Sequence, residues 1–139
     1  MKPFEIKHDP LKEKTLSLAI RIFKLNRFLI EQKKEFVISK QILKSGTNPG
    51  AMVREADNAE SGADFIHKLS IAQKEVCETQ YWLELLWRTS LINETEYSSL
   101  TNDLKEVIKL LVSSIRTCRK NLHQKSNSDF VSNKQSRQN

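Results

Sequence analysis

Residues 61–90 read SGADFIHKLSIAQKEVCETQYWLELLWRTS, and this stretch decides the fold. Its apolar positions recur at every third or fourth residue, which is the spacing of one face of an α-helix. Ser61 and Asp64 at its start have the spacing of a capping box, in which side chains bond the free N–H groups of the first turn. The stretch therefore predicts an amphipathic helix. Its apolar face consists of Phe65, Leu69, Ala72, Val76, Thr79, Leu83 and Leu86.

Three further segments show the same periodicity and predict three more helices. Residues 10–31 follow Asp9 and Pro10, a pair typical of helix starts because Asp caps free N–H groups and Pro has none to lose. Residues 36–59 and 94–122 carry apolar faces with the same spacing. The apolar face of the first segment is widened by Leu16, Ala19, Phe23 and Ile30.

The four predicted helices are joined by short connections, so we expect an all-α, antiparallel up-down four-helix bundle over residues 10–122. Residues 1–9 would form an N-terminal extension. Residues 123–139 are rich in Ser, Asn, Gln and Lys, which predicts a disordered, basic C-terminal tail. Pro49 lies inside the second segment, and because proline removes a backbone hydrogen bond, it predicts a kink or a break there.

The composition excludes several classes of protein. The chain has 139 residues, enough for one domain, and its three Gly and three Pro are too few for an all-β fold. It has no Gly-rich phosphate-binding loop and no apolar run long enough to span a membrane. Residues 1–10 lack the apolar core of a secretory signal, so we do not expect them to act as one. Cys77 and Cys118 show no metal-ligand spacing. We expect a cytoplasmic protein without a membrane partner.

The net charge of +6 is concentrated at the two ends of the chain. Residues 1–34 carry a net charge of +5 and residues 119–139 carry +4, whereas the residues between them carry −3. A basic surface can bind nucleic acid by neutralising phosphates without contacting bases. Alternatively, these cations form a solvated helix face and a favourable interaction with a helix C-terminus. The candidate phosphate contacts are Lys14, Arg21 and Lys24, which fall within roughly 80° on the first helix, and Arg116, Arg119 and Lys120 at the end of the last.

The predicted helix over residues 61–90 has more apolar surface than one bundle core needs. Ile71, Tyr81, Trp82 and Leu85 lie on a different arc from its apolar face, among charged residues. Mixed aromatic and aliphatic patches of this kind are typical of protein interfaces. These four residues therefore predict an oligomer interface. The alternative is that the helix over residues 36–59 bends across the patch and buries it within the monomer.

Residues that could carry chemistry are sparse. Asp64 and His67 have the carboxylate-x-x-His spacing of di-iron bundles, but such a site needs a second pair on a facing helix, and the sequence offers none. The three histidines are too dispersed to indicate a nucleophile with its base. We therefore expect a non-catalytic protein with no cofactor and no metal. A metal-dependent enzyme that uses Asp64 and His67 is the least favoured alternative.

Two groups of residues resemble the pattern of a known family. In residues 61–90 they are Ser61, Asp64 to Ala72, Glu75, Glu78, Thr79, Tyr81 to Leu83, Leu85 and Leu86. In residues 36–59 they are Ser45, Thr47, Ala51, Val53, Glu55 and Ala56. The pattern is similar to that of the small four-helix bundle proteins encoded in intervening sequences of bacterial 23S ribosomal RNA genes, over about residues 10–120. Asn48, Pro49 and Met52 depart from the family pattern, which has Ser, Ile and Asn there.

The resemblance implies a left-handed bundle that assembles into a ring, typically a homopentamer, in which Ile71, Trp82 and Leu85 would serve as ring interface. It also implies similarity to the accessory bundle proteins of diversity-generating retroelements, which bind nucleic acid and a reverse transcriptase. We expect a non-catalytic oligomer that binds structured RNA or another nucleic acid through phosphate contacts. The alternative is a protein-interaction scaffold or accessory adaptor without nucleic-acid binding of its own.

Overall fold

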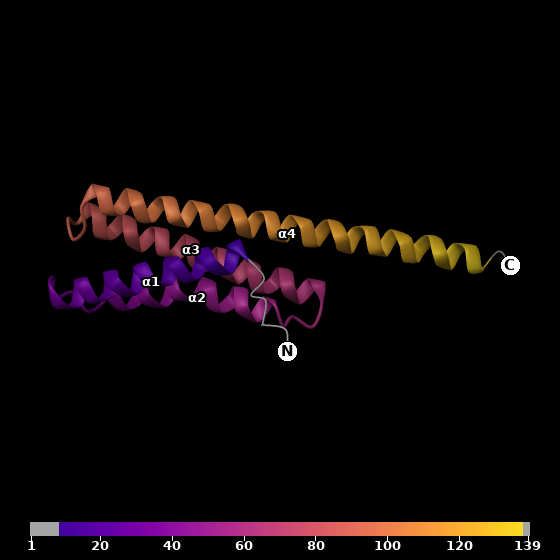
Figure 1. Ribbon diagram of the computed structural model, residues 1–139, viewed down its shortest axis with the longest axis horizontal. Coiled ribbons are helices and arrows are strands. Elements are labelled where there is room, and N and C mark those ends of the chain that lie inside the picture. Colours follow the sequence, from indigo (N-terminus) through magenta and orange to yellow (C-terminus); the bar gives the residue numbers. More distant parts are fainter. Residues whose placement is uncertain (1–8, 138–139) are drawn as a thin grey trace, which may run out of the picture.

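A computed structural model describes residues 9–137 and confirms the predicted fold class. It contains four α-helices and, within the described residues, no strand (Figure 1). Residues 1–8 of the expected N-terminal extension lie outside the described residues, as do residues 138–139. The helices are α1 (Pro10–Glu31), α2 (Ile38–Ala56), α3 (Gly62–Arg88) and α4 (Glu94–Ser136).

Each helix begins where a side chain accepts hydrogen bonds from free backbone N–H groups. Asp9 caps α1 through the N–H groups of its first turn, Ser61 accepts from the N–H of the third residue of α3 at 3.1 Å, and Asn93 caps α4 at 2.8 Å. At α2 the carboxylate of Glu35 accepts from three successive N–H groups, at 2.7 to 2.9 Å. Because Glu35 supplies this cap from the preceding connection, α2 begins at Ile38.

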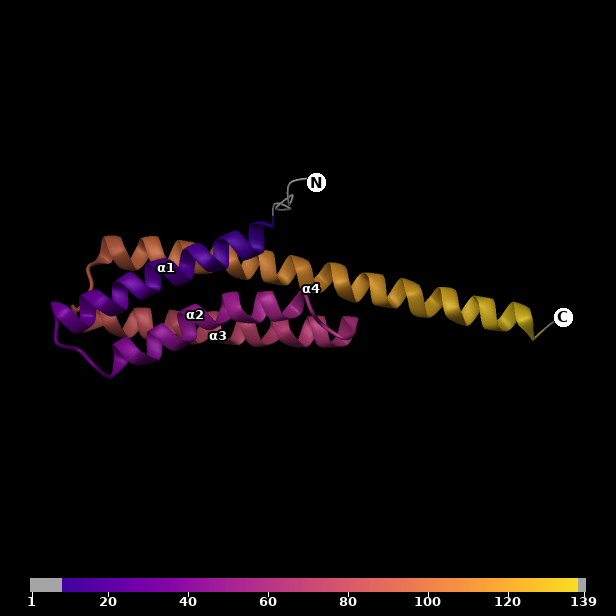
Figure 2. The same ribbon diagram turned by 60° about the horizontal axis from the view of Figure 1, so that its bottom comes forward.

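The helices pack in the order of the chain. α1 packs on α2, α2 on α3 and α3 on α4, and α4 closes the bundle against α1, while the diagonal pairs make no close contact among the described residues (Figure 2). Apolar side chains from all four helices fill the space between them. The largest fully buried ones include Leu18, Ile22 and Leu29 of α1, Ile42 of α2, Leu69, Leu83 and Leu86 of α3, and Leu100, Leu104 and Leu111 of α4.

Pro49 predicts a kink or a break in the second helix. The structure shows no break, because α2 continues through Pro49. Figure 2 shows that α2 bends partway along its length, as expected of a helix with an internal proline. The same region lies against α1, because Gly46 has no side chain: a Cβ placed on it would lie 2.7 Å from two carbons of Ile22. The buried amide of Asn26 adds a polar tie by donating to the carbonyl of Ser39 at 2.9 Å.

The end of α4 differs from the prediction of a disordered tail over residues 123–139. The structure continues α4 as a helix to Ser136, and the helix projects from the bundle (Figures 1 and 2). Every described residue from 121 onward is exposed, so little packing holds this part in place. The helix continues because residues 118–136 contain no Gly or Pro, and extending an existing helix costs less than nucleating one. Leu122, near the start of this part, lies against Gly62 of α3.

Candidate functional site

The basic side chains predicted on the first helix are partly occupied by acidic partners on α4. Lys14 Nζ donates to Glu106 Oε2 at 2.7 Å, and Arg21 Nη1 donates to Asp103 Oδ2 at 2.6 Å. The hydrogen bond with Glu106 raises the pKa of Lys14, and the same bond lowers the pKa of Glu106. Lys24 is exposed and forms no ion pair among the described residues. Of the three predicted phosphate contacts on α1, only Lys24 is therefore free of a carboxylate.

The basic side chains predicted at the end of the last helix have a different environment. Arg116, Arg119 and Lys120 are all exposed on α4, close to where it leaves the bundle, and form no ion pair within residues 9–137. Because α4 continues as a helix beyond the predicted end, these cations lie in the middle of a long exposed helix instead of at its C-terminus. A favourable interaction with the helix C-terminal dipole, which acts only over the last turn, therefore does not account for them.

The apolar patch predicted on the third helix is exposed at one residue and half-buried at three. Tyr81 is 59% exposed, whereas Ile71, Trp82 and Leu85 are half-buried. Trp82 packs against the core, and its ring meets that of Tyr81 edge to face with centroids 5.0 Å apart. The buried indole Nε1 of Trp82 has no hydrogen-bond partner among residues 9–137. Burial within the monomer thus covers part of this patch and leaves the rest on the surface.

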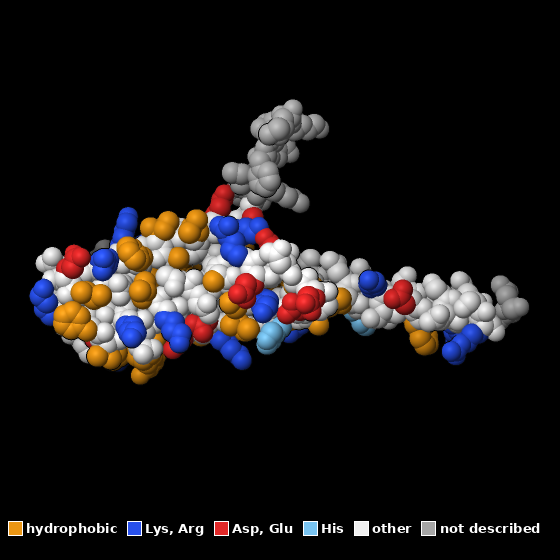
Figure 3. Space-filling view, turned by 90° about the horizontal axis from the view of Figure 1, so that it is seen from below, with side chains coloured by type: hydrophobic (Ala, Val, Ile, Leu, Met, Phe, Trp, Pro, Cys, Tyr) orange, Lys and Arg blue, Asp and Glu red, His pale blue; other side chains and the backbone are white. Residues whose placement is uncertain are grey.

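Sequence reasoning missed a second apolar surface, on α1. Leu16, Ile20 and Phe23 are 50, 48 and 52% exposed and lie on one face of the helix; we call them the α1 stripe. The prediction that Leu16 and Phe23 widen the core-facing side of this helix is wrong. The signal was present in the sequence, because these positions lie more than about 90° from Leu18 and Ile22 on a helical wheel. Figure 3, which views the α1 and α2 side, shows hydrophobic side chains at the bundle surface.

The candidate metal ligands are not brought together. The Asp64 carboxylate accepts from the N–H of Glu60 at 3.2 Å, while its own N–H donates to Ser61, so it belongs to the cap of α3. His67 is exposed one turn away. No group of three or more His, Cys, Asp or Glu side chains within residues 9–137 is placed to hold a metal ion. None of the described helices is both long and apolar enough to cross a membrane.

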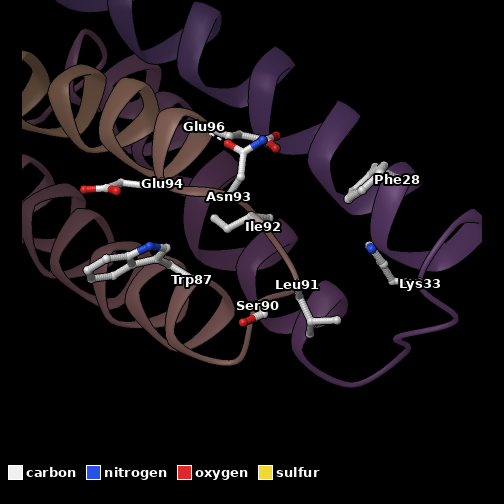
Figure 4. Close-up of a pocket in the computed structure, with 9 residues that line it drawn as sticks. All are labelled: Phe28, Lys33, Trp87, Ser90, Leu91, Ile92, Asn93, Glu94 and Glu96. Atoms are coloured by element: carbon white, nitrogen blue, oxygen red, sulfur yellow. Dashed lines mark hydrogen bonds between the residues drawn. The ribbon is translucent and has the colours of Figure 1, made fainter.

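Among the described residues, the hollows of the surface are shallow and bring together no nucleophile with a base. One of about 440 Å³ lies where the connection between α3 and α4 meets the end of α1 (Figure 4). Its walls include Trp87 and Ile92 from the connection side and Phe28 with Lys33 from the α1 side. Asn93, which also lines it, is occupied in capping α4. Such a hollow can accept a side chain of a partner, but it offers no nucleophile paired with a base.

The bundle is similar to proteins known from their sequence or structure. The family model of the 23S rRNA-intervening sequence protein matches residues 10–113. A crystal structure at 1.70 Å of a protein with unknown function, from the S23 ribosomal protein family of Bacteroides thetaiotaomicron, is 56% identical. That match covers 76% of this chain and 97% of the other, with a TM-score of 0.75. No curated protein matches the chain. The family match covers the bundle and ends before Arg116.

Proposed function

The chain belongs to the family of 23S rRNA-intervening sequence proteins, and from that premise we propose that it is a non-catalytic, cytoplasmic, oligomeric bundle that binds RNA through phosphate contacts. The solved relative is itself described as a protein with unknown function. The proposal therefore depends on the surfaces of this chain, and it has two parts, RNA binding and assembly into a homopentameric ring.

One observation carries the RNA-binding part, namely the unbalanced charge along α4 from residue 116. Residues 116–137 contain six basic side chains and a single acidic one, Asp129, which gives a net charge of +5 on an exposed helix. Clustered Lys and Arg side chains bind polyanions by releasing the counterions that surround the phosphates. Such binding needs no base contacts and no catalytic group, in keeping with the surface described above.

Two apolar faces of the monomer support assembly. The α1 stripe faces outward on the α1–α2 side, and the patch of Ile71, Tyr81 and Leu85 faces outward on the α2–α3 side. Both lie at one level of the bundle. Gly46 of α2 packs on Ile22, the residue before Phe23 in α1, while the neighbouring Ser45 accepts a hydrogen bond from Thr79 of α3. Two different patches on one subunit make a head-to-tail contact, which generates a ring when the rotation closes.

The angle between these faces fits a small ring. From the helical wheels, the outward directions of the α1 stripe and the α3 patch differ by roughly 100°. A closed ring of about four or five copies needs neighbours at such an angle. A homopentamer, the assembly implied by the family resemblance, is therefore compatible with the positions of these patches. In such a ring α2 would face the centre and α4 the periphery.

The RNA-binding part is tested with the full-length chain and a structured RNA, by fluorescence anisotropy over a series of salt concentrations. We expect binding at about 50 mM salt and a linear fall of log affinity with log salt, with a slope that reflects the number of phosphates contacted. Absence of binding at this salt concentration refutes RNA binding and leaves the scaffold alternative.

The assembly part is tested by light scattering, in which a ring has a mass several times the 16.1 kDa of one chain. Leu16→Glu places a charge in the α1 stripe and should reduce the mass to that of the monomer. Ser17→Glu is the matched control, because it places the same charge on the neighbouring exposed residue outside the stripe. A wild-type chain that is monomeric, or a loss of assembly in both variants, contradicts the proposal.

The scaffold alternative is favoured by the ion pairs of Lys14 and Arg21, since these cations are already occupied within the monomer. It predicts an oligomer of unchanged mass that shows no affinity for RNA. Light scattering and anisotropy on one preparation therefore separate the two functions.

A further inference from the structure

The part of α4 beyond the family match has a surface unlike that of the bundle. We call residues 116–137 the α4 arm. The family match ends at residue 113, and every described residue from 121 onward is exposed. At the helical rise of 1.5 Å per residue, the arm continues about 20 Å beyond Leu122. Apart from the half-buried Cys118, which donates to the carbonyl of Gly62, and Leu122, which lies against Gly62, its side chains are exposed. Core packing therefore does not explain the pattern in which they occur.

The side chains of the arm are sorted by face. On a helical wheel, eight positions fall within an arc of roughly 100°, and we call them the basic stripe. Lys125 and Asp129, the remaining charged residues of the arm, lie on the opposite side of the helix. The stripe thus holds five of the six cations of the arm and no carboxylate. Its members are Arg116, Arg119, Lys120, His123, Asn127, Phe130, Lys134 and Arg137.

Between its cations the stripe also contains one phenylalanine, Phe130, and two polar side chains, His123 and Asn127. Phe130 is 69% exposed, and with Lys134 and Arg137 it lines a shallow hollow of about 320 Å³. One hydrophobic side chain beside a basic one is visible near the end of the arm in Figure 3. Asn127 Nδ2 lies 3.3 Å from His123 Nε2, so these two form a hydrogen-bonded pair between the cation clusters. An exposed phenylalanine flanked by cations has no role in packing this monomer.

Proteins that bind single-stranded nucleic acid combine two kinds of side chain. Cations lie along the phosphate backbone of the nucleic acid, and aromatic rings stack on its bases. We propose that the basic stripe of the α4 arm binds a single-stranded segment of RNA, with phosphates on its cations and a base stacked on Phe130. This inference rests on the proposed RNA binding and adds to it the element and the form of RNA. The arm is a poor membrane anchor, because Phe130 and Val131 lie about 100° apart and form no apolar face.

The cation part is tested on the full-length chain with a labelled oligouridine of about 16 nucleotides. Lys134→Glu reverses a charge in the stripe, and Lys125→Glu makes the same change on the opposite face of the same helix. We expect Lys134→Glu to lower the affinity about fivefold or more at roughly 0.1 M salt and to reduce the salt slope by about 0.7. Lys125→Glu should change both much less, since opposite faces of the arm are about a Debye length apart.

Stacking of a base on Phe130 is tested with a matched pair of substitutions. Phe130→Ala should lower the affinity for oligouridine at least about fivefold, the lower limit for losing one stacked base, whereas Val131→Ala removes a neighbouring exposed apolar side chain and should leave it unchanged. Equal affinities of these two variants overturn stacking on Phe130. An RNA duplex of the same length bound more tightly than the single strand overturns the single-stranded form.

The outcomes separate this inference from the proposed function. If the wild-type chain binds no RNA, both fall together. If it binds RNA while Lys134→Glu and Lys125→Glu bind alike, only the assignment to the arm is overturned. Displacement of the RNA by polyglutamate at equal charge concentration overturns RNA as the ligand and points to an acidic protein. Circular dichroism and light scattering of each variant check that fold and mass are unchanged.

Discussion

Gly46→Ala should destabilise the bundle although alanine is the better helix former. The substitution places a Cβ 2.7 Å from Cγ1 and Cγ2 of Ile22 and 3.1 Å from its Cβ. Ile22 is fully buried between the helices and cannot rotate away. Overpacking of a filled core costs about 1–3 kcal/mol, while replacing a helical Gly with Ala contributes about 0.5–1 kcal/mol. We expect a net loss of roughly 1–2 kcal/mol in the free energy of unfolding.

Gly50→Ala is the control, because the same change in the same helix meets different surroundings. A Cβ on Gly50 lies 3.6 Å from Thr15, an ordinary contact, so the substitution should stabilise the protein by about 0.5–1 kcal/mol. Urea unfolding at equal protein concentration measures both, and with a slope of about 2 kcal/mol per molar urea the midpoints should move in opposite directions by a few tenths of a molar or more. A Gly46→Ala midpoint at or above that of the wild type refutes the close approach of α1 and α2.

Three further substitutions test individual polar groups by urea unfolding. Burial opposes ionisation of Glu35, but its hydrogen bonds to three backbone N–H groups outweigh this and lower its pKa. The stabilising effect of the Glu35 carboxylate is therefore fully present above the pKa that it has in the unfolded chain. This effect is lost as the pH falls through its lower pKa in the folded protein. Glu35→Gln should accordingly cost about 1 kcal/mol at pH 7 and much less near pH 3; equal losses at both pH values would contradict this. Asn26→Leu removes the side-chain donor to the buried carbonyl of Ser39, which keeps its hydrogen bond within α2, and should cost about 0.5–1.5 kcal/mol; a neutral effect would mean that this tie between α1 and α2 adds nothing to stability. Burial and then the nearby Glu78 raise the pKa of Glu75, so its charge destabilises the fold above that pKa; Glu75→Gln should stabilise the protein at pH 7 and lose this advantage near pH 3.

The core was predictable from the sequence because periodicity identifies which residues share a face. Leu69, Val76 and Leu83 are buried as their spacing predicts. Periodicity does not give the width of the arc that neighbouring helices cover. The sequence therefore places Leu16 and Phe23 on the core side, although about half of each side chain is exposed. That width depends on the distance between helices, and here it depends on Gly46, whose contact with Ile22 joins residues far apart in the chain.

The surface charges were harder to predict, because their partners are distant in sequence. Lys14 and Arg21 read as free cations on the first helix, yet Glu106 and Asp103 reach them from α4. For the last helix, the sequence predicts a disordered tail where the structure has a helix. The polar composition after Leu122 predicted disorder, and only the continuation of α4 to Ser136 brings Arg119 and Lys134 onto one face. Composition indicates how much apolar surface a segment can bury. It does not indicate whether a helix continues, and the face on which a side chain lies depends on that continuation.

The proposed ring and the proposed RNA contact use different sides of the subunit, and this has a consequence for their coupling. The basic stripe begins on the α3–α4 side, where Arg116 and Arg119 line a hollow with Gln73 of α3. That side is opposite the α1 stripe, so assembly would leave the arm free. Copies related by rotation about an axis parallel to their helices would project their arms at the same end of the ring, where one RNA can contact several of them.

Linked sites of this kind bind more tightly than any one of them, because each later contact occurs at a high effective concentration. Loss of the ring through Leu16→Glu should therefore weaken RNA binding although every cation of the stripe is intact. Loss of a cation through Lys134→Glu should weaken binding and leave the mass of the ring unchanged. RNA binding would thus depend on the ring, whereas the ring would not depend on RNA binding. This result distinguishes an oligomer that presents RNA-binding arms from a scaffold whose basic tail has no part in its function.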